Sequence, residues 1–260
     1  MTLTPTTDLR ARCELLRSLH RKGDPLLLPN AWDVATAQAV AAAGFAVVAT
    51  TSWAVAATLG YEDEERAPAD EMFAAAARIA RSVEVPVTVD AEAGYGMQPA
   101  ELVTALRDAG AAGCNLEDTE WPAGSLRDPD QQAEWLTAVR EAALAARYPL
   151  VINARVDAFF HPFLADESGP QEEFVTDAVR RANAYLNAGA DCVYPICLWE
   201  INALRRFMSE VSGSVNITRE PTAPSIPELA ALGVARVSWG PLLQWDAMAR
   251  FQEQLASLRD

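Results

Sequence analysis

Short apolar runs rich in β-branched residues alternate with segments of helical period along the chain. Four stretches share one pattern, a helix end followed by a glycine and an apolar run, at residues 41–48, 108–117, 187–194 and 231–238. A glycine just beyond a helix is typical of its C-terminus, and the apolar run after it predicts a buried strand. Extended over the sequence, the pattern predicts eight strands, near residues 26–29, 45–50, 86–90, 113–117, 150–154, 192–196, 214–218 and 236–239.

A segment of helical period follows each predicted strand, which indicates an α/β fold. Strands that are apolar almost throughout favour a parallel sheet with both faces covered. Eight such units in 260 residues match a (β/α)8 TIM barrel, which typically has about 250 residues. A doubly wound sheet is the alternative, although it usually contains fewer units. A short leading helix is expected over residues 8–20, and residues 1–260 are expected to form a single barrel domain because no linker interrupts the pattern.

The last predicted helix has a wider apolar face than one flank of a barrel requires. Its apolar side chains are Leu242, Leu243, Trp245, Met248, Phe251, Leu255 and Leu258. A face of this width is typical of a helix that packs on a further partner. An ordinary eighth barrel helix is the alternative.

The balance of charges argues against two classes of partner. The formal net charge is −15, with 21 Lys and Arg residues against 36 Asp and Glu residues. Nucleic acids and anionic membranes both require basic surface, so neither is expected as a partner. No apolar run approaches the roughly 18 residues of a membrane span, and the N-terminus lacks the pattern of a signal peptide. We therefore expect a cytoplasmic protein.

Three scarce residue types narrow the chemistry. Lys22 is the only lysine and precedes the first predicted strand, which disfavours Schiff-base catalysis by a lysine at a strand end. His20 and His161 are the only histidines, which disfavours a zinc or iron site built from imidazoles. The four cysteines contain no Cys-x-x-Cys pair, so no disulfide framework is indicated.

Carboxylates collect where the predicted strands end. Asp90 and Glu92 follow a buried strand and, two residues apart in extended backbone, point to the same side. The next strand ends in Glu117, and Asp63 lies in the loop after the second strand. The C-terminal ends of the strands form the catalytic end of a barrel, and carboxylate oxygens are the ligands that Mg²⁺ prefers. The sequence thus predicts an acidic barrel end that can hold a divalent cation.

Arg155 ends the fifth predicted strand, at the same end of the barrel. A guanidinium in this place is suited to binding a carboxylate through two parallel hydrogen bonds. An ion pair with Asp157 or Glu117 is the alternative. His161, farther along the same loop, is either a general acid or base or a loop histidine without a role.

Six motifs in order resemble the isocitrate lyase/phosphoenolpyruvate mutase superfamily, and the resemblance covers nearly the whole chain. They are Leu28-Pro-Asn-Ala-Trp-Asp33, Thr51-Ser52, Leu59-Gly60 with Asp63, Asp90-Ala-Glu-Ala-Gly-Tyr-Gly96, Leu116-Glu-Asp118 and Asn153-Ala-Arg155. The resemblance implies an α/β barrel whose eighth helix is exchanged between the subunits of a homodimer or homotetramer. It also implies Mg²⁺ or Mn²⁺ as the cofactor, with a small carboxylate substrate, a 2-oxo acid or its enolate, at that metal.

Carried over by position, the resemblance implies roles for a set of residues at the strand ends. The implied metal ligands are Asp90, which binds most directly, and Glu92, Glu117 and Asp63, which bind directly or through water. The predicted substrate-binding residues are Thr51, Ser52, Trp53, Gly96, Arg155 and Asn216. The predicted catalytic residues are Tyr95, Arg155 and Glu117.

The loop after the fourth strand departs from the superfamily. Its isocitrate and methylisocitrate lyases carry a Lys-x-Cys-Gly-His-type loop there, and its phosphonopyruvate-type mutases carry a lysine and an asparagine. Residues 119–128 contain no lysine, cysteine, histidine or asparagine, and Pro122 and Gly124 beside Trp121 predict a mobile loop with one aromatic anchor. Because this loop offers no thiol or amine, the proton must come from elsewhere, and the candidates are Tyr95, His161, Glu120 and a metal-bound water. Tyr95 is the predicted donor, next to a cation that lowers the pKa of a phenol from about 10.

These features predict a Mg²⁺-dependent carbon–carbon lyase or decarboxylase that acts on a small 2-oxo or 2-hydroxy carboxylate through a metal-bound enolate. Decarboxylation of an oxaloacetate-like substrate ranks slightly above cleavage of a hydroxylated tricarboxylate, because carbon dioxide leaves without a base removing a hydroxyl proton. Chemistry at a P–C bond of a phosphonopyruvate-like substrate is one alternative. Binding of a 2-oxo acid without catalysis is another.

Overall fold

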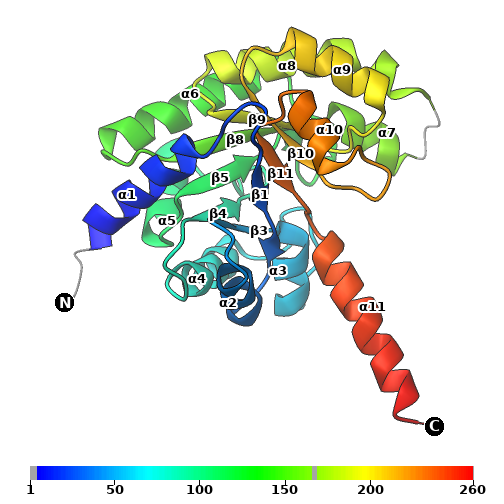
Figure 1. The fold of residues 1–260 in the computed structure, drawn as a ribbon. Coiled ribbons are helices and arrows are strands. Elements are labelled where there is room, and N and C mark those ends of the chain that lie inside the picture. The colour runs from blue at the N-terminus through cyan, green and yellow to red at the C-terminus, as the bar shows by residue number, and fades with distance from the viewer. Residues whose placement is uncertain (1–4, 166–168, 260) are drawn as a thin grey trace.

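The barrel closes through a strand that is interrupted once. The computed structural model describes residues 5–165 and 169–259, in which nine parallel strands form one sheet in the order β1-β11-β10-β9-β8-β5-β4-β3-β2. The end strands β1 (Leu26–Leu28) and β2 (Asn30–Ala31) are separated only by Pro29, which has no N–H to offer a neighbouring strand. β1 pairs with β11 and β2 pairs with β3, so together they serve as one barrel strand. The predicted (β/α)8 TIM barrel is confirmed (Figure 1).

The other seven barrel strands lie where the apolar runs predict them. They are β3 (Val48–Thr50), β4 (Val87–Asp90), β5 (Gly113–Leu116), β8 (Val151–Val156), β9 (Cys192–Pro195), β10 (Ser214–Thr218) and β11 (Arg236–Ser238). Polar side chains occupy part of the barrel interior. Arg236 of β11 donates across the barrel to Asn115 of β5 (3.1 Å), and Asn153 of β8 donates to the same Asn115 oxygen (2.9 Å).

Helices cover the outside of the barrel. They are α1 (Pro5–Ser18), α2 (Val34–Ala42), α3 (Ser52–Leu59), α4 (Ala69–Ala80), α5 (Pro99–Asp108), α6 (Pro129–Ala145), α7 (Phe160–Leu164), α8 (Val175–Asn187), α9 (Ile201–Glu210), α10 (Ile226–Ala231) and α11 (Leu242–Ser257). Local signals fix several starts: Asp33 caps α2 and Ser225 caps α10, each in a capping box. Within the residues that the structure describes, no helix is both long and apolar enough to cross a membrane.

Helix α1, the predicted leading helix, packs against the N-terminal ends of strands β5 and β8. Leu16 is fully buried, and a Cβ atom at Gly113 would lie 2.8 Å from its Cδ2 atom and 2.8 Å from the Val151 carbonyl oxygen. Only glycine permits this approach. Arg17 adds hydrogen bonds to Asp191 (2.7 Å) and to the carbonyl of Leu150 (3.0 Å), so α1 is tied to three strands at this end.

The segment predicted to be a mobile loop contains a short antiparallel hairpin. Strands β6 (Thr119–Glu120) and β7 (Ser125–Leu126) pair Thr119 with Leu126 and Glu120 with Ser125. The hairpin follows β5 and therefore stands at the C-terminal end of the barrel, which we call the mouth.

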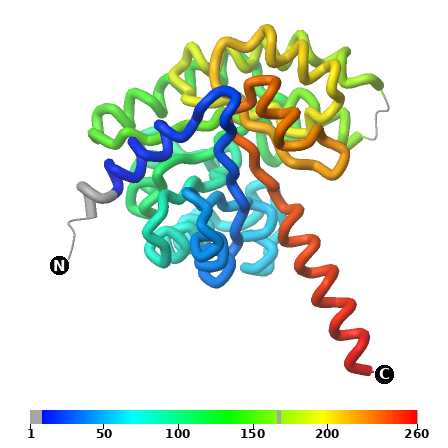
Figure 2. Tube along the Cα trace, in the orientation of Figure 1, coloured from blue at the N-terminus to red at the C-terminus, as the bar shows by residue number. Residues whose placement is uncertain are grey.

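Helix α11 leaves the barrel and extends away from it (Figure 2). It contacts the barrel through Trp245, which forms an edge-to-face pair with Trp53 of α3, with ring centroids 5.2 Å apart. The apolar side chains Trp245, Met248, Phe251, Leu255 and Leu258 are each at least 43% exposed. The wide apolar face predicted from the sequence is therefore uncovered in the single chain.

We expect His20, next to the end of α1, to make the protein less stable in acid. Burial, and then the nearby Arg236 guanidinium, lower the pKa of His20 from 6.5 to about 4. Between these values the unfolded chain binds a proton that the folded chain does not, so stability falls as the pH falls. The loss between pH 7.5 and pH 5 is about 2 kcal/mol. Urea unfolding at both pH values should show that His20→Gln removes this part of the pH dependence; an unchanged difference would contradict the assignment.

Candidate functional site

Three carboxylates meet at the mouth with little to neutralise them. Asp90 ends β4, Glu92 follows it, and Asp63 lies in the loop between α3 and α4. Burial, and then the neighbouring Asp90, raise the pKa of Asp63 to about 6. Burial, and then Asp63, raise the pKa of Glu92 to about 8. The three side chains are thus close enough for their negative charges to repel one another.

Asp90 is oriented by the end of the neighbouring strand. Its backbone N–H donates to Thr50 Oγ1 (2.8 Å), and its Oδ2 atom accepts from the backbone N–H of Ser52 (3.1 Å), the first residue of α3. The other oxygen, Oδ1, is buried and has no hydrogen-bond partner within the described chain. Asp63 Oδ1 is likewise buried and without a hydrogen-bond partner among the described residues. Buried carboxylate oxygens without partners are costly, which points to a cation or ordered water at this place.

Two loops interlock around Glu92. Its Oε2 atom accepts from the backbone N–H of Glu65 (2.5 Å), and the Glu65 carboxylate accepts from the backbone N–H of Tyr95 (2.5 Å). Glu65, Glu92 and Tyr95 all have positive φ, at 57°, 47° and 55°. Left-handed backbone is uncommon for residues with side chains, and it gathers at sites where the surroundings determine it.

Tyr95 lies against this carboxylate cluster. Its hydroxyl donates to Glu92 Oε1 (2.7 Å), and its ring packs edge-to-face on Phe73 with centroids 5.7 Å apart. Burial, and then the charge of Glu92, raise the pKa of Tyr95 well above 10. This direction is opposite to the one expected from a nearby cation alone, and it keeps the phenol protonated.

Arg155 is held between two buried carboxylates, so both ion pairs that the sequence left as alternatives are present. Its Nη1 atom lies 2.6 Å from Glu117 Oε2, and its Nε atom lies 2.6 Å from Asp157 Oδ1. The guanidinium also lies over the ring of Phe160, 4.8 Å from the centroid. The side chains of Arg155, Glu117 and Asp157 are 9%, 3% and 0% exposed, so these pairs differ from the weak pairs of a protein surface.

Glu117 has no free oxygen. Trp121 of the hairpin donates from its indole Nε1 to Glu117 Oε1 (2.6 Å), and Arg155 pairs with Oε2. In this arrangement Glu117 would contact a metal through water rather than directly. The sequence predicted Trp121 as the aromatic anchor of its loop, but it did not indicate that Glu117 would be the group it contacts.

The remaining predicted substrate residues are spread over the mouth. Thr51 and Ser52 are buried at the start of α3, and the Ser52 amide is taken by Asp90. The side chain of Trp53 is 37% exposed and packs on α11, so that only its backbone belongs to this site. Gly96 is exposed in its turn, and Asn216 is buried inside the barrel, where it donates to Ser238 (3.1 Å).

The residues present fit a hard divalent cation that uses few direct protein ligands. Among residues 5–165 and 169–259, no three His, Cys, Asp or Glu side chains come together in an arrangement that would enclose a metal. Asp90 and Asp63 nevertheless each offer one unpartnered oxygen in a cluster of repelling carboxylates. Mg²⁺ commonly binds through one or two carboxylates and completes its octahedron with water.

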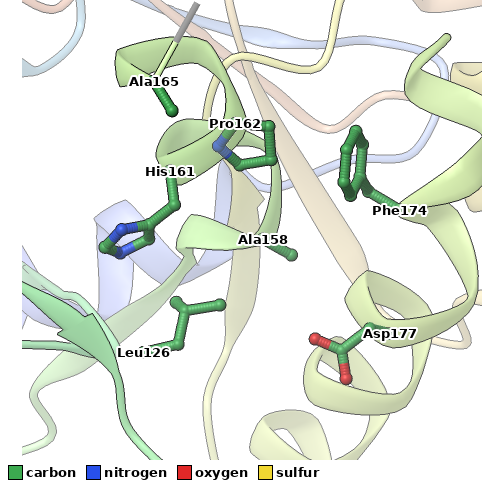
Figure 3. A pocket seen from close by; sticks show the side chains of 7 residues that line it. All are labelled: Leu126, Ala158, His161, Pro162, Ala165, Phe174 and Asp177. Carbon is green, nitrogen blue, oxygen red and sulfur yellow. The ribbon is translucent and has the colours of Figure 1, made fainter. Parts of the chain in front are cut away.

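A cavity of about 410 Å³ lies beside the hairpin, which contributes Leu126 of β7 to its lining (Figure 3). It is lined by Leu126, Ala158, His161, Pro162, Ala165, Phe174 and Asp177. His161 lies 3.0 Å from Thr119 Oγ1, and that hydroxyl donates to Asp157 (2.5 Å), the carboxylate that holds Arg155. His161 is thus linked to Arg155 through Thr119 and Asp157, and not directly.

Comparisons with known proteins identify the family of the chain. The family model described as phosphoenolpyruvate phosphomutase matches residues 16–259. An uncharacterised protein of Mycobacterium tuberculosis is 36% identical over 223 residues, which cover 85% of this chain and 80% of that protein. A Corynebacterium glutamicum protein provisionally named 2-methylisocitrate lyase 1 is 30% identical over 90% of this chain and 77% of its own length.

A solved structure is also similar over almost its whole length. This protein of Burkholderia cenocepacia J2315, provisionally described as a phosphonomutase, superposes with a TM-score of 0.89 at 39% identity and covers 96% of this chain and 99% of its own. The likeness therefore extends to the strand ends that carry the carboxylates. The chain belongs to the phosphoenolpyruvate phosphomutase family, within the isocitrate lyase/phosphoenolpyruvate mutase superfamily of lyases and mutases.

Proposed function

We propose that this protein is a Mg²⁺-dependent lyase that cleaves a carbon–carbon bond next to the carbonyl of a small 2-oxo carboxylate, with decarboxylation of an oxaloacetate-like substrate as the favoured reaction. One observation carries the proposal. The mouth places a cluster of mutually repelling carboxylates beside a buried arginine that is fixed by Glu117 and Asp157.

The carboxylate cluster would hold the cation. Asp90 and Asp63 have unpartnered oxygens for it, and Glu92 adds charge beside them. A bound divalent cation supplies positive charge that stabilises the enolate left when the carbon–carbon bond breaks.

Arg155 would bind and orient the substrate. Its Nε and Nη1 atoms are committed to Asp157 and Glu117, and Nη2, which makes neither bond, is the donor that we assign to the substrate carboxylate. Because both partners are buried, the guanidinium keeps one orientation and little freedom is lost when the substrate binds.

Tyr95 would supply the proton. Loss of carbon dioxide leaves the electron pair of the broken bond on C3 as an enolate, and transfer of the phenol proton to C3 gives pyruvate. The phenolate then recovers a proton from water. Burial and Glu92 keep the phenol protonated before this step.

Tyr95→Phe should lower the rate of pyruvate formation by roughly 10²-fold, the usual scale for one acid–base group. The matched control is Tyr61→Phe, which removes a hydroxyl bonded to Glu71 on the protein surface. Steady-state assays with both variants measure the effect. A Tyr95→Phe rate equal to that of wild type would move the proton-donor role to His161 or to water.

The two alternative functions are less well supported. A phosphonate dianion needs more positive charge than a carboxylate, and the charge of Arg155 is already shared between two buried carboxylates. Binding without catalysis would not require an oriented phenol at the carboxylate cluster.

We further propose that the protein assembles as a homo-oligomer through α11. The uncovered apolar face of this helix continues from its contact with Trp53, close to the start of α3 at the mouth. A second copy of the chain would cover this face. This arrangement corresponds to the exchange of the eighth helix between subunits that the superfamily resemblance implies.

A coupled assay tests the activity directly. Oxaloacetate is incubated with the protein and Mg²⁺, and pyruvate is followed with a lactate dehydrogenase, against an enzyme-free reaction at the same Mg²⁺ concentration and a reaction with excess EDTA. We expect release above the enzyme-free rate that EDTA abolishes. Release from 2-methylisocitrate or phosphonopyruvate, with none above background from oxaloacetate, would contradict the ranking of substrates.

A further inference from the structure

Asp118 is a second buried carboxylate beyond the end of β5, next to Glu117. Its side chain is fully buried, and both of its oxygens accept hydrogen bonds. Oδ1 accepts from the backbone N–H of Asp157 (2.9 Å), and Oδ2 accepts from the Tyr185 hydroxyl (2.6 Å) and from Arg181 Nη1 (3.1 Å). The carboxylate therefore joins helix α8, which carries Arg181 and Tyr185, to the residue that follows β8.

The sequence of α8 places both donors on one face. Asp177, Arg181 and Tyr185 follow one another at intervals of four residues, so they form one row along the helix. Arg181 donates from Nε to Asp177 (2.6 Å) and from Nη1 to Asp118, so its guanidinium is held on both sides. Its positive charge offsets that of Asp118, and a buried carboxylate is costly unless it is paired in this way.

Asp118 also satisfies an amide that lies beyond the strand ladder. β8 pairs with β9 as far as Val156 and Pro195, and Asp157 follows the last pair. A buried N–H is costly to leave unpaired, so the bond to Asp118 Oδ1 fixes the backbone of Asp157. From this backbone the Asp157 carboxylate accepts from Arg155 Nε (2.6 Å). The contacts from α8 to Arg155 thus run through buried groups throughout.

We propose that Asp118 is a positioning residue for the substrate-binding arginine. Arg181 and Tyr185 orient its carboxylate. That carboxylate fixes Asp157, and Asp157 in turn sets the direction of the Arg155 guanidinium. The proposal rests on the proposed function, which assigns Arg155 to the substrate carboxylate. A binding group displaced by about 1 Å can cost about 10²-fold in activity, so a residue that never touches the substrate can control how well the substrate is held.

Tyr185→Phe tests the proposal with the loss of a single hydroxyl. Calorimetry with Mg²⁺ present measures binding of oxalate, a small dicarboxylate whose binding does not depend on turnover. The affinity for oxalate should fall by about 10-fold, the lower end of what one hydrogen bond to a charged group is worth. The affinity for Mg²⁺ itself should not change, because Asp118 faces Asp157 and α8 rather than the carboxylate cluster.

Asp118→Ala removes the whole link and should lower the affinity for oxalate by about 10²-fold. Tyr185→Phe carries the test if circular dichroism shows that the alanine variant is unfolded. Arg155→Lys sets the scale, because it removes the guanidinium itself, and it should bind oxalate no better than Asp118→Ala does.

The matched control is Tyr148→Phe, which also removes a buried hydroxyl. Tyr148 is buried, and its hydroxyl donates to the carbonyl of Ala111 at the opposite end of the barrel, where β5 and β8 begin. Thermal unfolding should show that it destabilises the fold as Tyr185→Phe does. Its affinity for oxalate should equal that of the wild-type protein, which a purely structural role of Tyr185 would not distinguish.

Several results would overturn the proposal. They are wild-type oxalate affinity in Tyr185→Phe, an equal loss of oxalate affinity in Tyr148→Phe, and a loss of Mg²⁺ affinity together with that of oxalate. Wild-type oxalate affinity in Arg155→Lys would overturn both the proposal and the assignment of Arg155 to the substrate carboxylate.

Failure of the proposed activity gives a different result. If the variants bind oxalate as expected but the wild-type protein releases no pyruvate from oxaloacetate, the result counts against the proposed activity alone. Wild-type protein that does not bind oxalate would overturn both proposals.

Discussion

Asp90→Ala should abolish detectable Mg²⁺ binding and lower kcat/KM by about 10³-fold or more, while the barrel still folds. Asp90 offers a buried, unpartnered oxygen in the carboxylate cluster, Asp63 offers a second one, and Glu92 is held by the backbone N–H of Glu65. Loss of a metal that stabilises a developing enolate costs several kcal/mol of transition-state stabilisation, or about 10³-fold in rate. Calorimetric titration with Mg²⁺ and the pyruvate assay measure the two effects.

The matched control is Glu62→Gln, which removes one negative charge from an exposed side chain that pairs with Arg66 on the surface. It should keep the wild-type affinity for Mg²⁺. Circular dichroism and thermal unfolding establish that Asp90→Ala is folded, as expected for a residue at the end of a barrel strand. Wild-type Mg²⁺ affinity in Asp90→Ala would exclude Asp90 as the principal ligand.

Removal of α11 should convert the protein into a monomer. Truncation after Gly240 deletes the exposed apolar face, on which Phe251 and Leu255 are 51% and 46% exposed. Burial of such side chains contributes on the order of 1.5–3 kcal/mol each, so the loss of several removes most of the association energy. Sedimentation or size-exclusion chromatography with light scattering measures the assembly.

Point variants separate the apolar face from the helix itself. Phe251→Asp should dissociate the assembly, and Glu253→Gln, an exposed polar position on the same helix, should leave it intact. A truncated chain that elutes as the same assembly as the full chain would exclude α11 as the interface.

Much of the fold was predictable because its signals are local. Each barrel strand is a short apolar run that is followed by a segment of helical period. Both patterns can be recognised from neighbouring residues, without knowledge of the rest of the chain. Closure of the barrel was harder to predict. It depends on β2, a strand of two residues beyond Pro29, and so short a segment carries no pattern that indicates its pairing with β3.

The site was predictable where it lies on strand ends and not where it depends on contacts between loops. Asp90, Glu117 and Arg155 lie at the mouth, as the order of strands predicts, although their roles there stay proposals. The hairpin with Trp121 was predicted as a mobile loop from its proline and glycine, and its pairing was not visible because its strands have only two residues each and its anchors lie on other elements.

Two further features were not predicted, and only the first of them lacked a signal in the sequence. Glu65 joins the site through backbone hydrogen bonds in left-handed conformation, which a single glutamate in an acidic loop does not indicate. Arg236 is different: a lone arginine between Ala235 and Val237 in an apolar strand marks a polar barrel interior, and this sign was present in the sequence.

The central claim, that the mouth stabilises the enolate of a small 2-oxo acid with the help of Mg²⁺, is tested most directly by solvent exchange. Pyruvate is incubated with the protein and Mg²⁺ in deuterium oxide, and NMR follows replacement of the C3 protons by deuterium, with enzyme-free, EDTA and Asp90→Ala reactions as controls. Our account predicts exchange well above the enzyme-free rate, lost with EDTA and in Asp90→Ala. Exchange by the wild-type protein at the enzyme-free rate would contradict it.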